Sequence, residues 1–199
     1  CLVEIPAGMS ATHAALTEPA ATALHALHMA QRASVRPVQE SRVLVIGGGA
    51  IGMFMALLLR NYGVRDVAVA ETNALRRASV ERHAGAHAFD PVHETGPAEN
   101  SCDVVLDCVG AKVTRNSALK TVRHGGVIVH IGLQDWASEI DMRKLTLAEI
   151  TLIGTYTYTM SDLGSTVKAL HAGAFGDCAW VEERALSDGA AAFADLHEG

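Results

Sequence analysis

The sequence has 199 residues, which is enough for one domain with a sizeable hydrophobic core. Hydrophobic residues make up 49% and charged residues 19% of the chain, so the composition is globular and not that of a disordered protein. The net charge of −6 argues against a nucleic-acid partner, and no apolar run is long enough to span a membrane. No signal peptide is visible, and we expect a cytoplasmic protein.

The cysteines indicate the redox state of the protein's surroundings, and the first residues indicate whether the chain is part of a longer protein. No two cysteines form a C-x-x-C pair, so we expect reduced thiols at Cys1, Cys102, Cys108 and Cys178. The sequence begins with a cysteine instead of a methionine, and residues 2–5 have the pattern of a strand that would need a partner. We therefore expect this chain to be a domain of a larger protein.

The N-terminal part of the sequence predicts two helices. Residues 11–16 form a short helix with Ser10 as its cap, and Thr17 caps a longer helix that runs to about residue 33. Glu18 and Pro19 suit the first turn of the longer helix, where an acid and a proline are both favoured. Its predicted buried face holds Ala23, Leu24, Leu27 and Ala30.

The stretch from residue 42 to residue 71 has the pattern of a dinucleotide-binding unit. Residues 43–46 are an unbroken apolar run, as expected of a strand that is buried on both faces of a parallel sheet. Glycines follow in the G-x-G-x-x-G spacing, then an apolar helical run and a second strand that ends at an acid. The glycines are Gly47, Gly49 and Gly52, and the acid is Glu71.

Each of these residue types has a mechanical reason. Gly47 permits the tight turn out of the strand, Gly49 lets a pyrophosphate approach the backbone, and Gly52 lets the helix lie close to the sheet. The apolar helical run covers residues 51–60, and its N-terminus offers free N–H groups and a positive dipole end to the phosphates; Ala50, just before it, is also expected to contact the cofactor. Glu71 can accept hydrogen bonds from both hydroxyls of an adenine ribose and would repel a 2′-phosphate, which favours NAD over NADP.

Strands and helices alternate through the rest of the sequence. The expected helices cover residues 73–84, 113–122, 143–149, 161–172 and 189–197, and the expected strands cover 86–89, 103–109, 127–131, 140–142, 151–154 and 180–185. Residues 93–101 form a polar loop at a place where a right-handed crossover normally uses a helix. The alternation predicts an α/β fold with a doubly wound parallel sheet (a Rossmann fold), with ligands bound at the carboxyl ends of the strands.

With these elements in order, the sequence resembles the cofactor-binding part of a zinc-dependent medium-chain dehydrogenase/reductase, in the sorbitol and threonine (polyol) dehydrogenase branch. The matching segments run nearly end to end: IPAGMS, AALTEPAATALHA, VLVIGGGAIG, VAVAETNALRR, CDVVLDCVG, GGVIVHIGL, EITLIGTYTYT and DGAAAFADLHEG. The family's GroES-like catalytic domain, which supplies the main zinc ligands, matches nothing in this chain. The resemblance implies NAD as the cofactor, zinc in the full-length parent, an alcohol or polyol as the substrate, and no activity of this fragment alone.

The resemblance also implies roles for individual residues. Ile51 would lie under the cofactor, Glu71 would hold the adenosine ribose, and Arg76 would cover the adenine or its ribose. The other implied cofactor-binding residues follow the later strands: Val109 and Gly110 in the groove, Ile131, Gly132 and Leu133 beside the nicotinamide carboxamide, and Thr155, Tyr156 and Thr157 near the nicotinamide end.

Glu18 is the one residue of this chain that the resemblance implies in catalysis and near the metal. The polyol branch carries a glutamate at this point beside the catalytic zinc, as a ligand or through the zinc-bound water. There Glu18 would tune the zinc or relay a proton. The other explanation is a helix-start acid next to Pro19, which accounts for both residue types.

Other polar residues have weaker patterns. His25 and His28 share a helix face, but no third ligand of suitable spacing follows, so packed or solvated histidines are favoured over a metal site. His130 is expected to be packed or hydrogen-bonded, and Asp107 faces either the cleft or a loop. The family's arginine near the last nicotinamide contact is replaced by Thr157, so the identity of the substrate does not carry over.

We divide the chain into a connecting segment with the first helices (1–36), a dinucleotide-binding core (37–160) and a tail that leads back toward the missing catalytic domain (161–199). The predicted reaction transfers hydride between a secondary alcohol and NAD with zinc assistance. Strand 151–154 is a candidate sheet edge, and the family pairs such edges across a dimer, so we expect a homo-oligomer. Two alternatives stay open: a zinc-free medium-chain reductase of quinones or enones, and a non-catalytic NAD-binding module.

Overall fold

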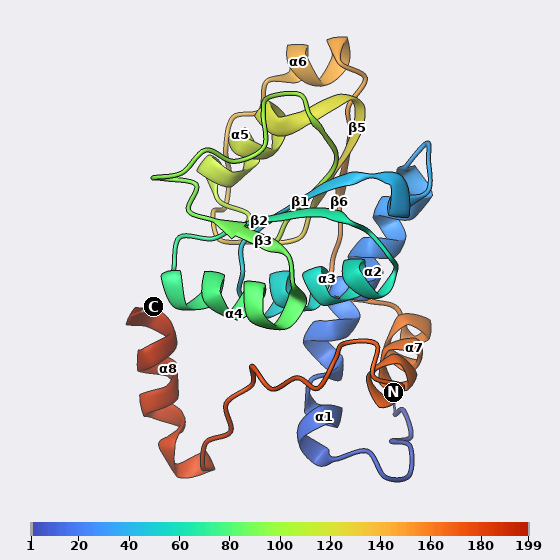
Figure 1. Cartoon of the computed structure of the whole chain (residues 1–199), viewed down its shortest axis with the longest axis vertical. Coiled ribbons are helices and arrows are strands. Elements are labelled where there is room, and N and C mark those ends of the chain that lie inside the picture. Colours follow the sequence, from blue (N-terminus) through green and yellow to red (C-terminus); the bar gives the residue numbers. More distant parts are fainter. Residues whose placement is uncertain (1, 199) are drawn as a thin grey trace.

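The computed structural model describes residues 2–198 and contains a six-stranded sheet (Figure 1). The strands are β1 (Arg42–Ile46), β2 (Asp66–Ala70), β3 (His87–Phe89), β4 (Cys102–Asp107), β5 (Val122–His130) and β6 (Thr151–Gly154). They lie in the order β3-β2-β1-β4-β5-β6, and every neighbouring pair is parallel. This is the strand order of a doubly wound Rossmann sheet, so the predicted fold class is confirmed.

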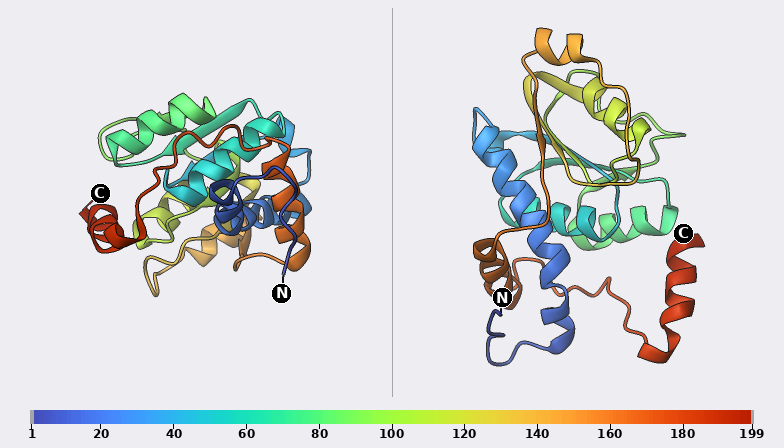
Figure 2. Two further views of the ribbon diagram at one scale, coloured as in Figure 1. Left: turned by 90° about the horizontal axis from the view of Figure 1, so that it is seen from below. Right: turned by 180° about the vertical axis from the view of Figure 1, so that it is seen from behind.

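Helices lie on both faces of the sheet (Figures 1 and 2). They are α1 (Ala11–Ala15), α2 (Thr17–Ala33), α3 (Ala50–Asn61), α4 (Ala74–Ala84), α5 (Lys112–Thr121), α6 (Met142–Leu147), α7 (Met160–His171) and α8 (Gly189–Glu198). Buried residues of α2, α3, α4 and α7 form one hydrophobic core with one face of the sheet, and buried residues of α5 form a second core with the other face. We call these the four-helix face and the α5 face.

Strand β1 shows why helices must pack on both faces of the sheet: its apolar side chains point to both faces. Val43 and Val45 belong to the core of the four-helix face, whereas Leu44 and Ile46 belong to the core of the α5 face. All four side chains are buried, as the unbroken apolar run predicts. The predicted buried face of α2 is also confirmed at Ala23, Leu24, Leu27 and Ala30.

A loop takes the place of a crossover helix between β3 and β4, as predicted. Residues 90–101 contain turns and bends but no helix. The loop lies against the last residue of β3, because a Cβ atom added at Gly96 would stand 2.4 Å from the ring of Phe89. A glycine therefore lets the loop cover this ring closely, and Phe89 stays buried.

Three predicted strands are wrong. Residues 2–5 and 140–142 have no strand structure, and residues 180–185 form a turn followed by an irregular segment. In the last case Trp180 packs edge-on against Phe54, with ring centroids 5.0 Å apart, so its ring is partly buried against α3 without joining a sheet. Strand β5 also begins earlier than predicted, at Val122, with a register shift against β4.

The junction of α1 and α2 differs from the prediction as well. Ser10 caps α1 as predicted, since its hydroxyl accepts a hydrogen bond from the N–H of His13 at 3.1 Å. Thr17 does not cap α2, because the cap position is Leu16, which has helical backbone angles. A capping side chain needs an extended backbone before the helix, and the end of α1 leaves no room for one.

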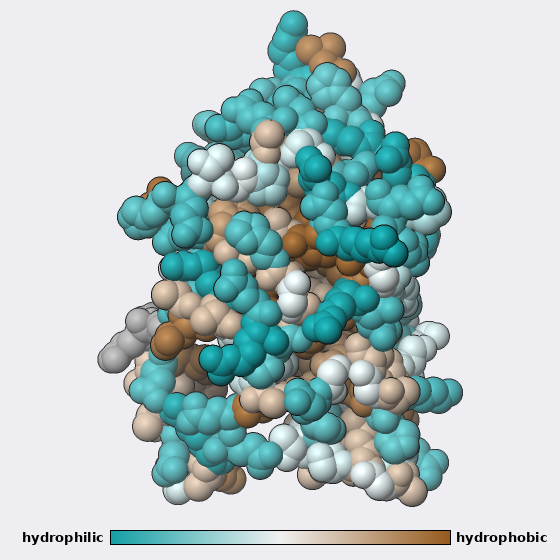
Figure 3. Space-filling view, in the orientation of Figure 1, coloured by the Kyte–Doolittle hydropathy of each residue, from teal (hydrophilic) through white to brown (hydrophobic). Residues whose placement is uncertain are grey.

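The outer surface is mostly polar in the view of Figure 3, where apolar side chains show through in a hollow near the middle. Helix α8 stands off from the sheet at the end of a long irregular connection (Figures 1 and 2). Cys102 and Cys178 are buried free thiols, Cys108 is a half-buried one, and Cys1 lies outside the described residues. Within residues 2–198, no helix combines the length and the apolar character needed to cross a membrane.

Candidate functional site

A groove of about 400 Å³ lies where β1, β2 and β4 end. Parallel strands bring their carboxyl ends to one edge of the sheet, and this edge includes the point where the strand order reverses between β1 and β4. The lining residues that the sequence predicted are Gly47, Gly49, Ala50, Ile51, Gly52, Glu71, Arg76 and Val109. The fold therefore brings the predicted turn, helix start and acid into one wall.

Close backbone contacts explain the glycine spacing. Gly47 has a φ of +96°, a backbone conformation that side chains disfavour. A Cβ atom at Gly52 would lie 1.8 Å from the carbonyl oxygen of Gly47, so only glycine lets α3 pack this close to the turn. A Cβ at Gly49 would meet no atom within 4 Å, which leaves open space beside the backbone at the start of the helix.

Helix α3 presents its N-terminus to this open space. The helix begins at Ala50, and its cap residue Gly49 has no side chain to satisfy the first N–H groups. These N–H groups have no acceptor within the helix, and the helix dipole adds a partial positive charge. The wall at this point is built to receive an anionic group such as a phosphate.

Glu71 follows β2 and is only 7% exposed. Its Oε2 accepts a hydrogen bond from the N–H of Gly48 at 2.7 Å, and its Oε1 accepts one from the N–H of Asn73 at 2.8 Å. A Cβ at Gly48 would lie 3.1 Å from Cγ of Glu71, so the middle glycine of GGG allows the acid to approach the turn. The carboxylate is thus fixed between the glycine turn and the start of α4.

Other residues of the groove were not predicted. Thr72, Cys108 and Gln134 complete its lining. Cys108 directly follows β4 and Thr72 is the second residue after β2, so the strand ends were the signal that pointed to them. Burial raises the pKa of the Cys108 thiol, which keeps it neutral.

Asp107 does not face the groove, which decides between the two orientations left open by the sequence. The residue is completely buried at the end of β4. Its Oδ1 accepts hydrogen bonds from the N–H groups of Val109 and Gly110, at 3.1 and 2.9 Å. Its carbonyl accepts from Ile131 and Gly132. Asp107 therefore holds together the two loops that follow β4 and β5.

The remaining predicted cofactor residues lie beyond the lining of the groove. They are Gly110, Ile131, Gly132, Leu133, Thr155 and Tyr156, which follow the ends of β4, β5 and β6. Leu133 and Tyr156 are largely exposed, whereas the hydroxyl of Thr155 is buried with no partner among the described residues. The N–H of Thr155 donates to the carbonyl of His130, so β6 continues along β5 to this point.

The predicted zinc-proximal residue, Glu18, is exposed in the first turn of α2. In the described part of the chain, no three His, Cys, Asp or Glu side chains are grouped so as to hold a metal ion. His25 and His28 both donate from Nδ1 to Asp162, over 2.9 and 3.0 Å, and so connect α2 to α7.

Asp162 is the charged centre of this connection. Burial raises its pKa, but hydrogen bonds from the N–H and hydroxyl of Thr159 and from the two histidines outweigh burial and lower the pKa to about 2. The carboxylate also closes a capping box at the start of α7. These histidines therefore have a structural role in joining the two helices.

The strand order, the glycine turn and the acid after β2 define a dinucleotide-binding domain of the Rossmann type. Residues 50–172 match the family described as zinc-binding dehydrogenase. The match covers more than half of the described chain, and this protein belongs to that family.

Individual proteins that this chain resembles are dehydrogenases as well. Sorbitol dehydrogenase 1 of Saccharomyces cerevisiae is 27% identical over 187 residues, which cover 86% of this chain and 50% of that protein. L-idonate 5-dehydrogenase of Escherichia coli has a TM-score of 0.77 at 26% identity, over 86% of this chain and 49% of the other. A structure described as a zinc-binding dehydrogenase of Sinorhizobium meliloti bound to NADP has a TM-score of 0.75 at 26% identity, over 86% and 52%. The chain thus spans about half the length of the relatives it matches.

Proposed function

We propose that this chain is the NAD-binding part of a dehydrogenase that transfers hydride between a secondary alcohol, of the polyol class, and NAD. The observation that carries the proposal is the single groove wall formed by the glycine turn, the N-terminus of α3 and Glu71. A dinucleotide fits this wall, because the open space at Gly49 lets a pyrophosphate reach the first N–H groups of the helix. The relatives named for sorbitol and L-idonate support the polyol class, since both compounds carry secondary alcohols.

Glu71 supports NAD over NADP. One structural relative is bound to NADP, so the fold alone does not select the cofactor. In this chain a buried carboxylate stands in the groove after β2, where an adenine ribose would lie. Oε2 has a lone pair beyond the one that Gly48 uses, so it can accept from a ribose hydroxyl, whereas Oε1 already accepts from the N–H of Asn73 and the hydroxyl of Thr72. A 2′-phosphate would bring a second negative charge into contact with this carboxylate.

The nicotinamide end of the cofactor would lie past the ends of β5 and β6. The backbone groups of Ile131, Gly132 and Leu133 would meet its carboxamide, and Thr155 and Tyr156 would lie near its ring. The unpartnered hydroxyl of Thr155 supports this placement, because a buried hydroxyl gains from a hydrogen-bonding ligand. The division into residues 1–36, 37–160 and 161–199 belongs to the same proposal.

Zinc belongs to the full-length parent in this proposal, with its main ligands outside this chain. When bound, zinc acts as a Lewis acid on the alcohol oxygen. Glu18 is the residue of this chain that would stand near it, and its exposed carboxylate at the start of α2 is free to do so. The other contribution of this chain is to bind the cofactor and to orient its nicotinamide toward the alcohol.

Calorimetric titration with NADH and NADPH tests the cofactor proposal. We expect NADH to bind roughly tenfold or more tightly than NADPH, and Glu71→Gln to remove most of the difference by removing the charge. The amide keeps one of the two acceptor oxygens that hold Gly48 and Asn73, so the affinity for NADH should fall as well. Glu81→Gln, at an exposed glutamate on α4, is the matched control and should keep the preference. Tighter binding of NADPH by the unchanged chain would overturn the proposal and favour a zinc-free reductase of quinones or enones.

The exposed edge of the sheet supports assembly of two copies. Strand β6 is the last strand in the sheet order, and Thr151, Leu152 and Gly154 are exposed along it. Pairing of β6 with its counterpart in a second copy would satisfy the outward-facing N–H and C=O groups. Sedimentation equilibrium of the chain at micromolar concentration checks this proposal, with a dimer as the expected species.

A further inference from the structure

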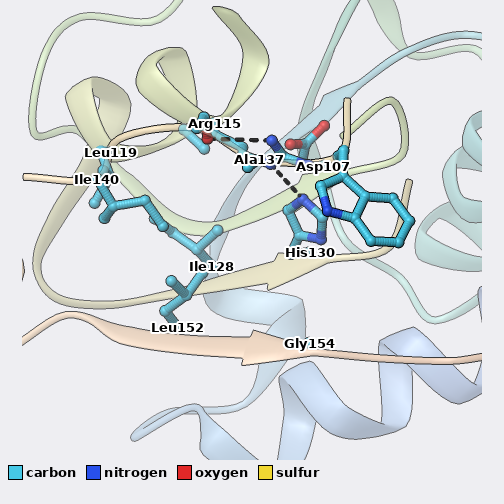
Figure 4. A pocket seen from close by; sticks show the side chains of 12 residues that line it. Asp107, Arg115, Leu119, Ile128, His130, Ala137, Ile140, Leu152 and Gly154 are labelled. Carbon is cyan, nitrogen blue, oxygen red and sulfur yellow. Dashed lines mark hydrogen bonds between the residues drawn. The ribbon is translucent and has the colours of Figure 1, made fainter. Parts of the chain in front are cut away.

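A cavity of about 370 Å³ lies on the α5 face of the sheet and has no role in the proposed function. Helix α5, the ends of β5 and β6, and the loop of residues 131–141 enclose it (Figure 4). Its size falls within the range of small-molecule sites. The cavity is separate from the dinucleotide groove, although both are bounded by the loop after β5: Gln134 lines the groove and Trp136 lines the cavity.

The cavity has an apolar end and a polar end. Figure 4 shows Leu119, Ile128, Ile140 and Leu152 gathered on one side, and Arg115, Asp107 and His130 on the other. A ligand with an apolar tail and a polar head matches this division, because its tail would leave water while its head finds hydrogen-bonding groups.

Arg115 dominates the polar end. Its Nε donates to Nε2 of His130 at 2.8 Å, its Nη1 to the hydroxyl of Ser138 at 3.1 Å, and its Nη2 to the carbonyl of Asp135 at 2.6 Å. All three acceptors are neutral, and none of the ion pairs among residues 2–198 includes Arg115. A guanidinium has more N–H groups than these bonds use, so the side chain is held in place with donors to spare.

The neighbours of Arg115 leave its charge available. His130 accepts at Nε2, so its own proton is on Nδ1 and the ring is a second donor. Asp107 is the one carboxylate in the lining, and its oxygens are already bonded to two backbone N–H groups and the hydroxyl of Thr114. The polar end therefore presents the donors and positive charge of Arg115 beside a carboxylate, Asp107, that already accepts three hydrogen bonds, and the donors with no partner suit a group that only accepts.

We propose that this cavity binds a small organic carboxylate with an aliphatic tail. The carboxylate accepts hydrogen bonds from Arg115, whose planar donors match carboxylate geometry. The tail lies among Leu119, Ile128 and Leu152. This site is independent of the dinucleotide groove and of the proposed alcohol substrate.

Tryptophan fluorescence tests the proposal with hexanoate as the probe. Trp180→Phe leaves Trp136, at the cavity, as the one remaining tryptophan. The change removes no hydrogen bond, because Nε1 of Trp180 is buried with no partner among the described residues. Hexanoate should give a saturable change in fluorescence, and hexanol a much weaker one. Saturating NADH in every sample keeps the anion out of the groove at α3.

Variants separate the site from unspecific binding. Arg115→Gln should weaken hexanoate binding by roughly tenfold or more, since a charge-assisted pair is lost. Lys112→Gln, at an exposed cation of the same helix outside the cavity, should leave binding unchanged. Leu152→Phe, at an exposed position on β6 that also lines the cavity, should weaken binding as well by filling the tail end. Absence of a saturable change, equal binding of hexanol, or unchanged binding in both cavity variants would overturn the proposal.

Discussion

The sheet carries four helices on one face and one long helix, the short α6 and a loop on the other. On the four-helix face Phe54 of α3 is fully buried, with its ring edge-on to Phe175 and Trp180 at centroid distances of 5.4 and 5.0 Å. On the α5 face the loop of residues 90–101 covers Phe89, and the cavity beside Leu119 remains open. The close-packed face carries the glycine turn, and the looser face leaves space for a separate ligand.

This difference in packing shows what helices and loops each provide when they cover a face of the sheet. Helices packed side by side hold the start of α3 at a fixed distance from β1, which the groove requires because its contacts are between backbone atoms. A loop satisfies its backbone polar groups less regularly and fills space less completely. Changes on the four-helix face should therefore be felt both in stability and in cofactor binding, and changes on the α5 face mainly in stability.

The largest effect is expected at the contact between α3 and the glycine turn. Gly52→Val would place atoms inside the carbonyl group of Gly47, where even a Cβ lies 1.8 Å from the oxygen. We expect a loss of more than about 4 kcal/mol in the free energy of unfolding and no measurable NADH binding. Urea unfolding and calorimetry check this; a variant that folds and binds NADH normally would show that the close approach is not required.

Truncation of one large buried side chain on each face tests the difference in packing between the two faces. Phe54→Ala should lower the free energy of unfolding by about 4 kcal/mol, because the ring contacts two other aromatic rings and the space cannot close. Leu119→Ala, at a residue that already borders the cavity, should cost about 2 kcal/mol. Equal losses in urea unfolding would contradict the difference in packing between the faces.

The link between α2 and α7 should make the four-helix face sensitive to acid. The pKa of Asp162 is lowered from 3.8 to about 2, so the folded state favours the charged carboxylate. The resulting stability, about 2 kcal/mol, is fully present above about pH 4 and is lost as the pH falls toward about 2. Asp162→Asn should remove this part of the pH dependence in urea unfolding, and an unchanged profile would exclude Asp162 as its source.

The smallest effect is expected where the loop covers Phe89. Gly96→Ala would bring a Cβ within 2.4 Å of the ring, but loop 90–101 has no helix to hold it rigidly in place. We expect a loss of about 1 kcal/mol and unchanged NADH affinity. A loss of unfolding free energy as large as that of Phe54→Ala would mean that the loop is packed as firmly as a helix. The proposed difference in packing between the two faces would then be wrong.

The sequence predicts most of the sheet and the glycine wall because both depend on local patterns. Apolar runs and glycine spacing act over a few residues, and they place β1, α3 and Glu71 correctly. The same reasoning fails for residues 180–185, where Trp180 packs on Phe54 of α3 and no residue pairs with a strand. It also fails at Thr17, whose capping role is removed by the helix before it.

Contacts between residues far apart in the sequence account for the other features that the sequence did not predict. The hydrogen bonds of His25 and His28 to Asp162 join residues more than a hundred positions apart, and no spacing in the sequence predicts them. Gln134 enters the groove because the loop after β5 returns to β4, where its N–H donates to the carbonyl of Val109. Such contacts are set by the assembled fold.

The position of Glu71 has a consequence for how cofactor preference can change over evolutionary time. Its carboxylate accepts hydrogen bonds from the backbone of Gly48 on one side and of Asn73 on the other. The same side chain therefore selects between the two cofactors and holds the glycine turn and the start of α4 in place. A substitution that admits a 2′-phosphate would leave two N–H groups without their acceptor. A switch of preference should therefore require a compensating change nearby, one that restores an acceptor before a new cation is useful.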